Sequence, residues 1–261
     1  MLEKKDEIMY FDAHFHFTYS FEHGIPADYS GCTCAHSINE WQFQLKNAPK
    51  RILLSYGIHP QSCASREKFS EWIVESEHFL EKLAEKQNEN RLVAIGEAGF
   101  DYFTEEFSNC KAQQEEAWIF QLELAKKYKL PLVVHCRKAN HKLFEYSAEL
   151  KKLPSVLFHS FMGPVAQAKS LLNRGINAYF SFGKQMLNSN KKVIECTMEL
   201  PSNSLLLETD APFQFLKNEA FTAPDEIKRV YKAAFELRKD FYDFFEFCHQ
   251  IESNYKNMFG W

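Results

Sequence analysis

Short runs of apolar residues alternate along the chain with longer segments whose apolar residues recur at helical spacing. Eight runs are expected to be strands, at residues 8–17, 31–35, 51–56, 92–96, 131–135, 155–159, 177–182 and 203–207. Helices are expected at residues 38–46, 66–87, 110–128, 138–151, 164–173, 190–200, 224–237 and 241–258. Continuous apolar strands are typical of a parallel sheet that helices cover on its faces. The pattern therefore predicts an α/β fold.

Eight strand–helix units in succession predict a closed (β/α)8 barrel of the TIM type, with its active site at the carboxyl ends of the strands. A doubly wound open sheet is the alternative. No linker or shift in composition divides the 261 residues, and single barrels commonly reach this length. We therefore expect one domain, residues 1–261, of which residues 1–7 are expected to be flexible.

The composition indicates which partners and which cellular compartment the protein has. The formal net charge of −4 indicates no broad basic surface, so a nucleic-acid partner would be bound by a local site. Seven scattered cysteines favour a reducing compartment over a disulfide framework. Cys32 and Cys34 form a C-x-C pair, for which burial is favoured over half of a soft metal site. The charged N-terminus and the lack of a long apolar run predict a cytoplasmic protein without a membrane partner.

Side chains that bind metals follow the apolar runs at several expected strand ends. His14 and His16 are two residues apart in the first strand, so both side chains point to one face. Later strands carry comparable groups at or just after their ends: Glu97, His135, His159 and Asp210. A carboxylate beside a buried run, such as that of Asp210, is costly to bury unless it is paired or binds a metal. These six residues are therefore predicted to form a metal site.

The number and type of these donors indicate more than one ion. Six ligands exceed what a single tetrahedral ion takes, and they suit two divalent ions that share a carboxylate. Glycine on both sides of Glu97 favours this residue as the bridge, because glycine allows close backbone approach. Mixed nitrogen and oxygen donors admit Mg²⁺, Mn²⁺, Zn²⁺ or iron, and the sequence does not choose among them. No lysine lies at an expected strand end in this set, so a carboxylated-lysine bridge is not expected.

Further residues are candidates for binding a substrate. His59 and Arg137 follow the third and fifth strands, and both are predicted to contact a phosphate. The alternatives are a structural histidine and, for Arg137, an ion pair with Asp101 or Glu97. Asp101 is interpreted as a loop-stabilising acid. Lys184 is interpreted either as a weaker phosphate ligand or as a solvated lysine.

Aromatic residues cluster beside the predicted ligands. They are Phe100, Tyr102, Phe103, Phe161 and Phe213. Such rings can stack on the bases of single-stranded nucleic acid. Packing in the core or at its rim is the favoured interpretation for most of them.

Six segments resemble, in order, the signatures of the TatD-like metal-dependent deoxyribonucleases, a family of the amidohydrolase-like superfamily. They are Phe-Asp-Ala-His-Phe-His, Gly-Ile-His-Pro, Ile-Gly-Glu-Ala-Gly-Phe-Asp, Val-His-Cys-Arg-Lys-Ala, Phe-His-Ser-Phe-Met-Gly and Leu-Leu-Glu-Thr-Asp-Ala-Pro. The resemblance implies a TIM barrel that acts as a two-metal hydrolase. It also implies that one ion is bound by His14, His16, Glu97 and Asp210, and the other by Glu97, His135 and His159.

The resemblance further implies an exonuclease-type deoxyribonuclease, in which a water activated by the ions attacks a phosphodiester of DNA. Asp210 and Glu97 are the expected catalytic residues, with Asp210 accepting or relaying the proton. An amidohydrolase or lactonase acting on a small amide or ester would use the same ions and is the alternative. Three departures from the family pattern bear on substrate choice. Phe100 replaces a usual leucine, residues 213–222 lack an Arg-Asn-Glu-Pro-like run, and residues 18–34 are short for the usual second strand and its approach.

Overall fold

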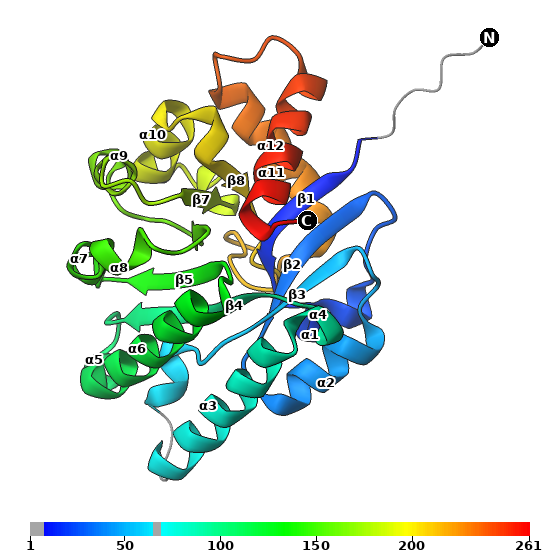
Figure 1. Cartoon of the computed structure of the whole chain (residues 1–261). Coiled ribbons are helices and arrows are strands. Elements are labelled where there is room, and N and C mark those ends of the chain that lie inside the picture. Colours follow the sequence, from blue (N-terminus) through cyan, green and yellow to red (C-terminus); the bar gives the residue numbers. More distant parts are fainter. Residues whose placement is uncertain (1–7, 65–68) are drawn as a thin grey trace.

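The computed structural model describes residues 8–64 and 69–261, and it contains one eight-stranded sheet (Figure 1). The strands are β1 (Tyr10–Phe15), β2 (Tyr29–Ala35), β3 (Ile52–Tyr56), β4 (Leu92–Asp101), β5 (Leu132–Arg137), β6 (Val156–Phe158), β7 (Ala178–Phe182) and β8 (Leu205–Leu207). Each strand pairs in parallel with the next one along the chain, in the order β1 to β8. The predicted parallel α/β sheet is confirmed. Residues 1–7, expected to be flexible, lie outside the described part of the chain.

Helices follow most of the strands. They are α1 (Phe17–Ser20), α2 (Ile38–Asn47), α3 (Phe69–Glu85), α4 (Gln87–Asn90), α5 (Glu105–Ser108), α6 (Lys111–Tyr128), α7 (Asn140–Glu145), α8 (Ser147–Leu150), α9 (Val165–Asn173), α10 (Lys191–Glu199), α11 (Ile227–Leu237) and α12 (Phe244–Phe259). Short 3-10 turns are η1 (Phe21–His23), η2 (Pro60–Cys63), η3 (Lys184–Met186), η4 (Ser202–Ser204) and η5 (Pro224–Glu226). The helix expected at residues 138–151 is divided into α7 and α8, and the expected beginning of the second helix, residues 66–68, lies outside the described residues.

Side-chain caps explain where several helices begin. The hydroxyl of Ser37 accepts the backbone N–H of Glu40 at the start of α2. The side chains of Asn190 and Asp243 accept N–H groups in the first turns of α10 and α12. Each cap satisfies a backbone donor that the helix itself leaves free.

The barrel closes through the residues that follow β8, because β8 itself ends at Leu207. The backbone N–H of Asp210 donates to the carbonyl of His14 at 3.0 Å, and the N–H of His16 donates to the carbonyl of Ala211 at 2.8 Å. These bonds join the segment after β8 to β1. In an open doubly wound sheet the first and last strands would not be joined in this way. The predicted (β/α)8 barrel is therefore confirmed, and its closure brings the residues after β8 against the end of β1.

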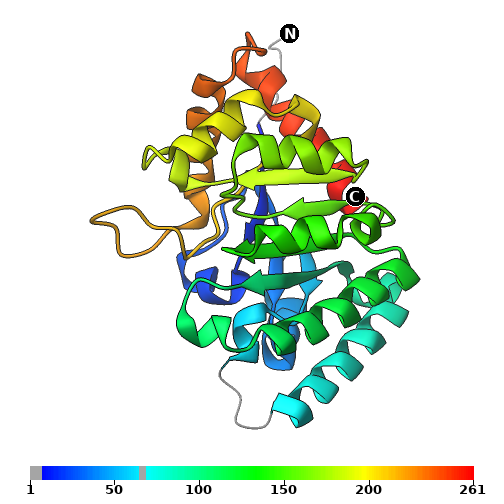
Figure 2. The ribbon, with the colours of Figure 1, turned by 90° about the vertical axis from the view of Figure 1, so that its left-hand side faces the viewer.

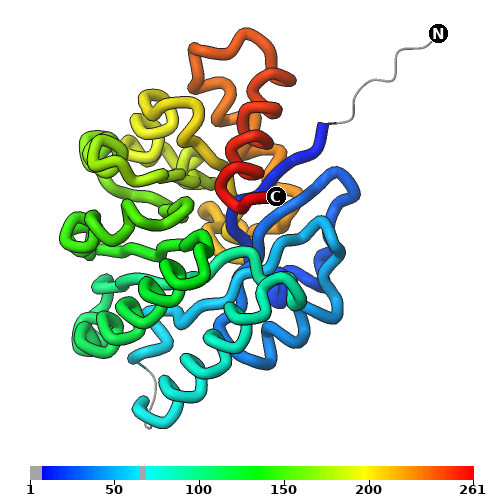
Figure 3. The backbone as a smooth tube through the Cα atoms, in the orientation of Figure 1, coloured from blue at the N-terminus to red at the C-terminus, as the bar shows by residue number. Residues whose placement is uncertain are grey.

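Helices surround the strands, and the carboxyl-terminal end of the chain lies close to β1 (Figures 1 and 3). The ring of Phe11 in β1 lies 5.1 Å from that of Tyr255 in α12 and 6.1 Å from that of Trp261. Figure 2 shows the green strands pointing to the side on which the loop after β8, in orange, projects. That side carries the carboxyl ends of the strands, where a barrel builds its active site. Within the described ranges no helix has the length and apolar character that crossing a membrane requires.

Strand β4 is longer than the predicted strand at residues 92–96. It continues to Asp101 because β5 keeps pairing with it, with Gly99 opposite His135. A Cβ at Gly96 would collide with the backbone carbonyl of Val133, and a Cβ at Gly99 with that of His135. The glycines therefore permit the close approach of β5 that was expected of them. Glu97 lies within the strand, held between these two contacts.

Candidate metal centre

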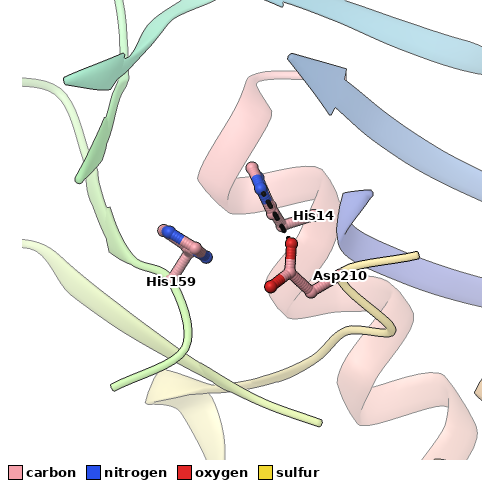
Figure 4. Close-up of side chains that lie close together, drawn as sticks. All are labelled: His14, His159 and Asp210. Carbon is pink, nitrogen blue, oxygen red and sulfur yellow. Dashed lines mark ion pairs between the residues drawn. The ribbon is translucent and has the colours of Figure 1, made fainter. Parts of the chain in front are cut away.

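The six predicted ligands lie together at the carboxyl ends of the strands. Figure 4 shows three of them, from β1, from the loop after β6 and from the segment after β8: His14, His159 and Asp210. All six are largely buried, and the side chain of Asp210, the most exposed, is 13% accessible. Strands far apart in the sequence thus place imidazoles and carboxylates around one point.

The carboxylate of Glu97 lies at the middle of this cluster, and its two oxygens face different imidazoles. Its Oε2 faces Nε2 atoms of residues on β1 and after β2: His14 at 3.3 Å, His36 at 3.4 Å and His16 at 3.9 Å. Its Oε1 faces nitrogens on β5 and after β3 and β6: His159 at 2.6 Å, His135 at 2.9 Å and His59 at 3.3 Å. A carboxylate with donors on both sides has the position of a bridging ligand between ions.

Asp210 lies on the side of Glu97 Oε2. Its Oδ1 is 3.3 Å from Nε2 of His16 and 3.6 Å from Nε2 of His14. Its Oδ2 accepts a hydrogen bond from the side-chain amide of Gln214 at 2.8 Å. One oxygen therefore faces the imidazoles while the other is held in place by the loop after β8.

Burial and charge set the protonation of the centre. Burial raises the pKa of Glu97, but the nearby His159, His59 and His14 outweigh it and hold that pKa well below its usual range. Burial lowers the pKa of His14 to about 4 and that of His59 to about 3. For His159 burial also acts downward, but the charge of Glu97 raises the pKa to about 9. At neutral pH the centre therefore holds an ionised Glu97 and at least two neutral imidazoles whose lone pairs can bind a metal.

The donor set fits divalent ions. Within the described residues, five buried imidazole nitrogens have no hydrogen-bond partner: His14 Nε2, His16 Nδ1, both ring nitrogens of His36, and His159 Nδ1. Burying an unsatisfied polar atom is costly, and a bound cation would offset that cost for the nitrogens that face the centre. Ligand atoms lie within 4.8 Å of one another in several groups of three, including His14 with His159 and Asp210, and Glu97 with His59 and His135.

A second carboxylate supports the imidazole of His135. Its Nε2 lies 3.2 Å from Oδ2 of Asp101, which also accepts a hydrogen bond from the amide of Gln61 at 2.7 Å. The other oxygen of Asp101 accepts the backbone N–H of Phe103 at 2.8 Å. The expected loop-stabilising role of Asp101 is confirmed, and the same side chain also orients His135.

The two predicted substrate residues differ in position. His59 belongs to the cluster, since its Nε2 lies 3.3 Å from Glu97 while its Nδ1 accepts the backbone N–H of Gln61. Arg137 lies at the rim with its side chain 44% accessible, its guanidinium 4.0 Å from the ring centre of Phe103 and 3.8 Å from Asp101. The alternative ion pair of Arg137 is therefore present with Asp101. A phosphate contact by either residue stays a prediction.

Both interpretations of Lys184 are wrong. Its side chain is 1% accessible and forms ion pairs with Glu219 and with Glu226, the second at 3.4 Å. Its ammonium group also contacts the hydroxyl of Thr222 at 3.3 Å. Residues 213–222 fold back over Lys184, so it anchors the loop after β8 instead of meeting solvent or substrate.

Four of the five aromatic residues near the ligands divide into two groups, and the fifth, Tyr102, is partly buried against the core. Phe100 and Phe161 are buried in the core, as favoured for most of the set. Phe103 and Phe213 are 48% and 47% accessible, and the ring of Phe213 lies 5.0 Å from that of His16. Exposed rings therefore lie beside the centre on the loops after β4 and β8.

Cys34, unlike Cys32, lies near a predicted ligand. Its Sγ is 3.7 Å from Nδ1 of His14 and 2.7 Å from the hydroxyl of Ser55. Burial raises the pKa of Cys34 well above its ordinary value, so the group is a neutral thiol. Both cysteines are buried, as favoured from the sequence.

Two residues of the centre were missed from the sequence. His36 directly follows β2 and faces Glu97; the strand-end rule that found the other ligands could have found it. Glu208 directly follows β8, is fully buried, accepts the hydroxyl of Ser181 and lies 3.8 Å from Nδ1 of His159. The sequence feature that could have indicated Glu208 is the pair of acidic residues on either side of Thr209.

A barrel that carries a cluster of imidazoles and carboxylates able to bind divalent metal at the carboxyl ends of its strands has the architecture of a metal-dependent hydrolase. The family model described as TatD related DNase matches residues 11–260, and the chain belongs to this family. The chain is similar in structure to YjjV, a TatD homologue from Escherichia coli k12, with a TM-score of 0.83, 24% identity, and coverage of 97% of this chain and 98% of that one. This likeness shows the shared fold.

Curated relatives match part of the chain. It is 35% identical over 161 residues to the "3'-5' ssDNA/RNA exonuclease TatD" of Pantoea ananatis, which covers 60% of this chain and 56% of that protein. It is 32% identical over 182 residues to the protein of the same name from Salmonella typhimurium, which covers 68% of this chain and 65% of that protein. The matched region thus spans between about half and two thirds of these relatives.

Proposed function

We propose that this protein is a metal-dependent exonuclease that removes nucleotides from the 3′ end of single-stranded DNA. The observation that carries the proposal is the position of Glu97, with imidazoles facing each of its two oxygens. His14, His16, Glu97 and Asp210 would bind one divalent ion, and Glu97, His135 and His159 the other. Bound ions would supply Lewis acidity and lower the pKa of water towards about 7. The names of the curated relatives support the substrate and the polarity.

Asp210 is suited to receive a proton in this reaction. Burial raises its pKa, but the hydrogen bond from His16 and the charges of His14 and His16 lower it overall, so the carboxylate is ionised at neutral pH. Gln214 holds one of its oxygens and leaves the other facing the imidazoles. An ionised acid fixed next to the reacting water can accept or relay its proton.

The rim of the centre offers groups for a single strand. Arg137 and Lys138 both lie over the exposed ring of Phe103, with Cζ at 4.0 Å and Nζ at 4.7 Å from its centre. Phe213 presents a second exposed ring beside His16. Rings can stack on unpaired bases, and a guanidinium can bind a phosphate in bidentate geometry. This local site suits a chain without overall positive charge.

The cysteines bear on where the protein acts. All seven are free thiols, which supports a cytoplasmic location, because the cytoplasm keeps thiols reduced.

A labelled oligonucleotide tests the proposal. Metal-stripped protein would receive Mg²⁺, Mn²⁺ or Zn²⁺ separately and be mixed with single-stranded DNA labelled at its 5′ end. We expect a ladder of progressively shorter labelled products with at least one ion, lost in Asp210→Asn and kept in Asp225→Asn, which alters an exposed acid of η5. Direct release of a labelled mononucleotide would contradict the proposed polarity. No cleavage by protein shown to hold its ions would favour hydrolysis of a small amide or ester.

A further inference from the structure

Ser160 follows the predicted ligand His159 in the loop after β6, and the two-ion arrangement gives it no role. Its backbone φ is +47°, in the left-handed region that few residues other than glycine adopt. The neighbouring strands hold the loop on both sides of it. The N–H of His159 donates to the carbonyl of Val134 in β5 at 3.2 Å, and the N–H of Phe161 donates to the carbonyl of Ser181 in β7 at 3.3 Å. Backbone of this kind persists where the surroundings impose it, and it occurs most often at functional sites.

Two side-chain amides bind the hydroxyl of Ser160. Nε2 of Gln214 donates to its Oγ at 2.8 Å, and Nε2 of Gln185 donates to it at 3.0 Å. A serine hydroxyl has two lone pairs that accept and one hydrogen that it donates, so these two bonds use its whole capacity to accept. In the described part of the chain the Oε1 atoms of both glutamines have no hydrogen-bond partner, so neither amide accepts the hydroxyl hydrogen. The hydrogen of Ser160 is therefore left to donate to another group.

This hydroxyl lies beside the proposed proton acceptor, Asp210. Nε2 of Gln214, which is 2.8 Å from Oγ of Ser160, is also 2.8 Å from Oδ2 of Asp210. The contact with Asp210 fixes the direction of the amide, because only its nitrogen can donate to a carboxylate. Ser160 is partly exposed, whereas His159 before it is buried. The hydroxyl is thus accessible to a molecule bound between His159 and Asp210.

We propose that Ser160 is a substrate-binding residue that donates its hydroxyl hydrogen to a phosphoryl oxygen of the nucleotide, with Gln185 and Gln214 fixing its direction. The inference rests on the proposed function, because it names a contact made by the same site. The ionised carboxylates of the centre have no hydrogen to offer such an oxygen. A hydrogen bond to an ionised acceptor is about twice as strong as one between neutral groups. A neutral donor also binds the phosphate without repelling the metal ions, as an added cation would.

Binding of a mononucleotide tests the contact without relying on catalysis. Zinc-loaded full-length protein would be titrated with thymidine 5′-monophosphate in a calorimeter, as wild type, Ser160→Ala and Ser253→Ala. Ser253 is an exposed serine of α12 and serves as the matched control. We expect the dissociation constant to rise about 10- to 100-fold in Ser160→Ala and to stay unchanged in the control, with equal zinc content by mass spectrometry in all three. Equal dissociation constants would overturn the proposal, and so would loss of zinc from Ser160→Ala, which would show that Ser160 supports the ions instead.

Gln185 provides a second test, because its amide contacts Ser160 and it is not a predicted metal ligand. Gln185→Met keeps the length of the side chain and removes one of the two bonds that fix the hydroxyl. We expect its dissociation constant to rise less than that of Ser160→Ala, and the double variant to bind as Ser160→Ala does, since the glutamine acts through the hydroxyl. Losses that add in the double variant would refute this positioning role. Circular dichroism would show that the variants are folded.

Cleavage of the labelled oligonucleotide keeps this inference separate from the proposed function. Weaker nucleotide binding by Ser160→Ala, together with no DNA cleavage by wild type, would refute the nuclease proposal and keep the contact. DNA cleavage by wild type, together with unchanged nucleotide binding by Ser160→Ala, would refute the contact and keep the nuclease proposal.

Discussion

Nε2 of His159 lies 2.6 Å from Oε1 of Glu97, the shortest distance that this carboxylate makes to the six imidazoles around it. The charge of Glu97 raises the pKa of His159 to about 9 against the effect of burial. The proton on His159 therefore occupies a position that a metal ion needs. Protonation and metal binding compete for the same buried nitrogen.

This competition predicts that metal affinity increases with pH. Because the imidazole must lose its proton to bind an ion, we expect affinity to rise up to about tenfold per pH unit between pH 6.5 and 9. In the metal-free protein, the pair with Glu97 stabilises the fold fully below the unfolded-state pKa of 6.5, and this stabilisation is lost as pH rises through about 9. Zinc titration against a competing chelator at several pH values measures the first effect. An affinity independent of pH over this range would contradict it.

Glu97→Gln is predicted to disable the centre. The substitution keeps the size of the side chain but removes the negative charge that faces all six imidazoles. Since loss of a residue that only supports a ligand costs about 10- to 100-fold in metal affinity or activity, loss of the bridge is expected to cost more than about 100-fold. Zinc content and oligonucleotide cleavage would both fall. Glu199→Gln, which alters an exposed ion pair with Lys169, is the control and is expected to keep both.

Asp101→Asn is predicted to weaken metal binding without abolishing it. Oδ2 of Asp101 contacts both Nε2 of His135 and the side-chain amide of Gln61. An asparagine keeps only one acceptor oxygen, so it can orient the imidazole less firmly. We expect a loss of about 10- to 100-fold in zinc affinity, as for other carboxylates that support a metal-binding histidine. Titration with a chelator measures it. Unchanged affinity would show that the contact in the structure has no part in positioning His135.

The strand ends were predictable because parallel strands bring their carboxyl ends to one edge, whatever their separation in sequence. That rule alone is enough to predict that His14 and Asp210 belong to the same site. It missed His36, because the short polar run Gly-Cys-Thr-Cys before it reads as a weak strand, although β2 is buried throughout. The end of β4 was also missed, since pairing past Glu97 depends on β5, which follows only after helix α6.

The position of Lys184 depended on contacts that no local pattern contains. Its partners Glu219 and Glu226 lie on a loop and a turn well beyond it in the chain. Spacing and hydropathy describe neighbours along a strand or helix, whereas this ion pair depends on how residues 213–222 fold back. The sequence of residues 213–222 differs from the family pattern, which shows that the loop differs from that of other members. It does not show how the loop folds.

Lys184→Met is predicted to destabilise the fold and loosen the loop after β8. It would leave Glu219 and Glu226 without the buried ammonium group that pairs with both, so we expect the free energy of unfolding to fall below that of wild type. Lys169→Met removes one partner of an exposed ion pair and is expected to cost less than about 1 kcal/mol. Urea denaturation of both variants measures the difference. Equal stabilities would contradict the anchoring role.

Phe213→Ala is predicted to weaken binding of single strands while sparing the chemistry at the ions. Its ring is about half exposed beside His16, where a base next to the cleaved phosphate could stack. Stacking contributes about 1–3 kcal/mol per base, so we expect KM for an oligonucleotide to rise roughly 5- to 100-fold with kcat little changed. Tyr242→Ala, which removes a fully exposed ring of the loop before α12, is the control. A small chromogenic phosphodiester, which has no base to stack, should be hydrolysed equally by both variants. If Phe213→Ala impaired it as strongly as the oligonucleotide, Phe213 would act by supporting His16, and the base-stacking role would be refuted.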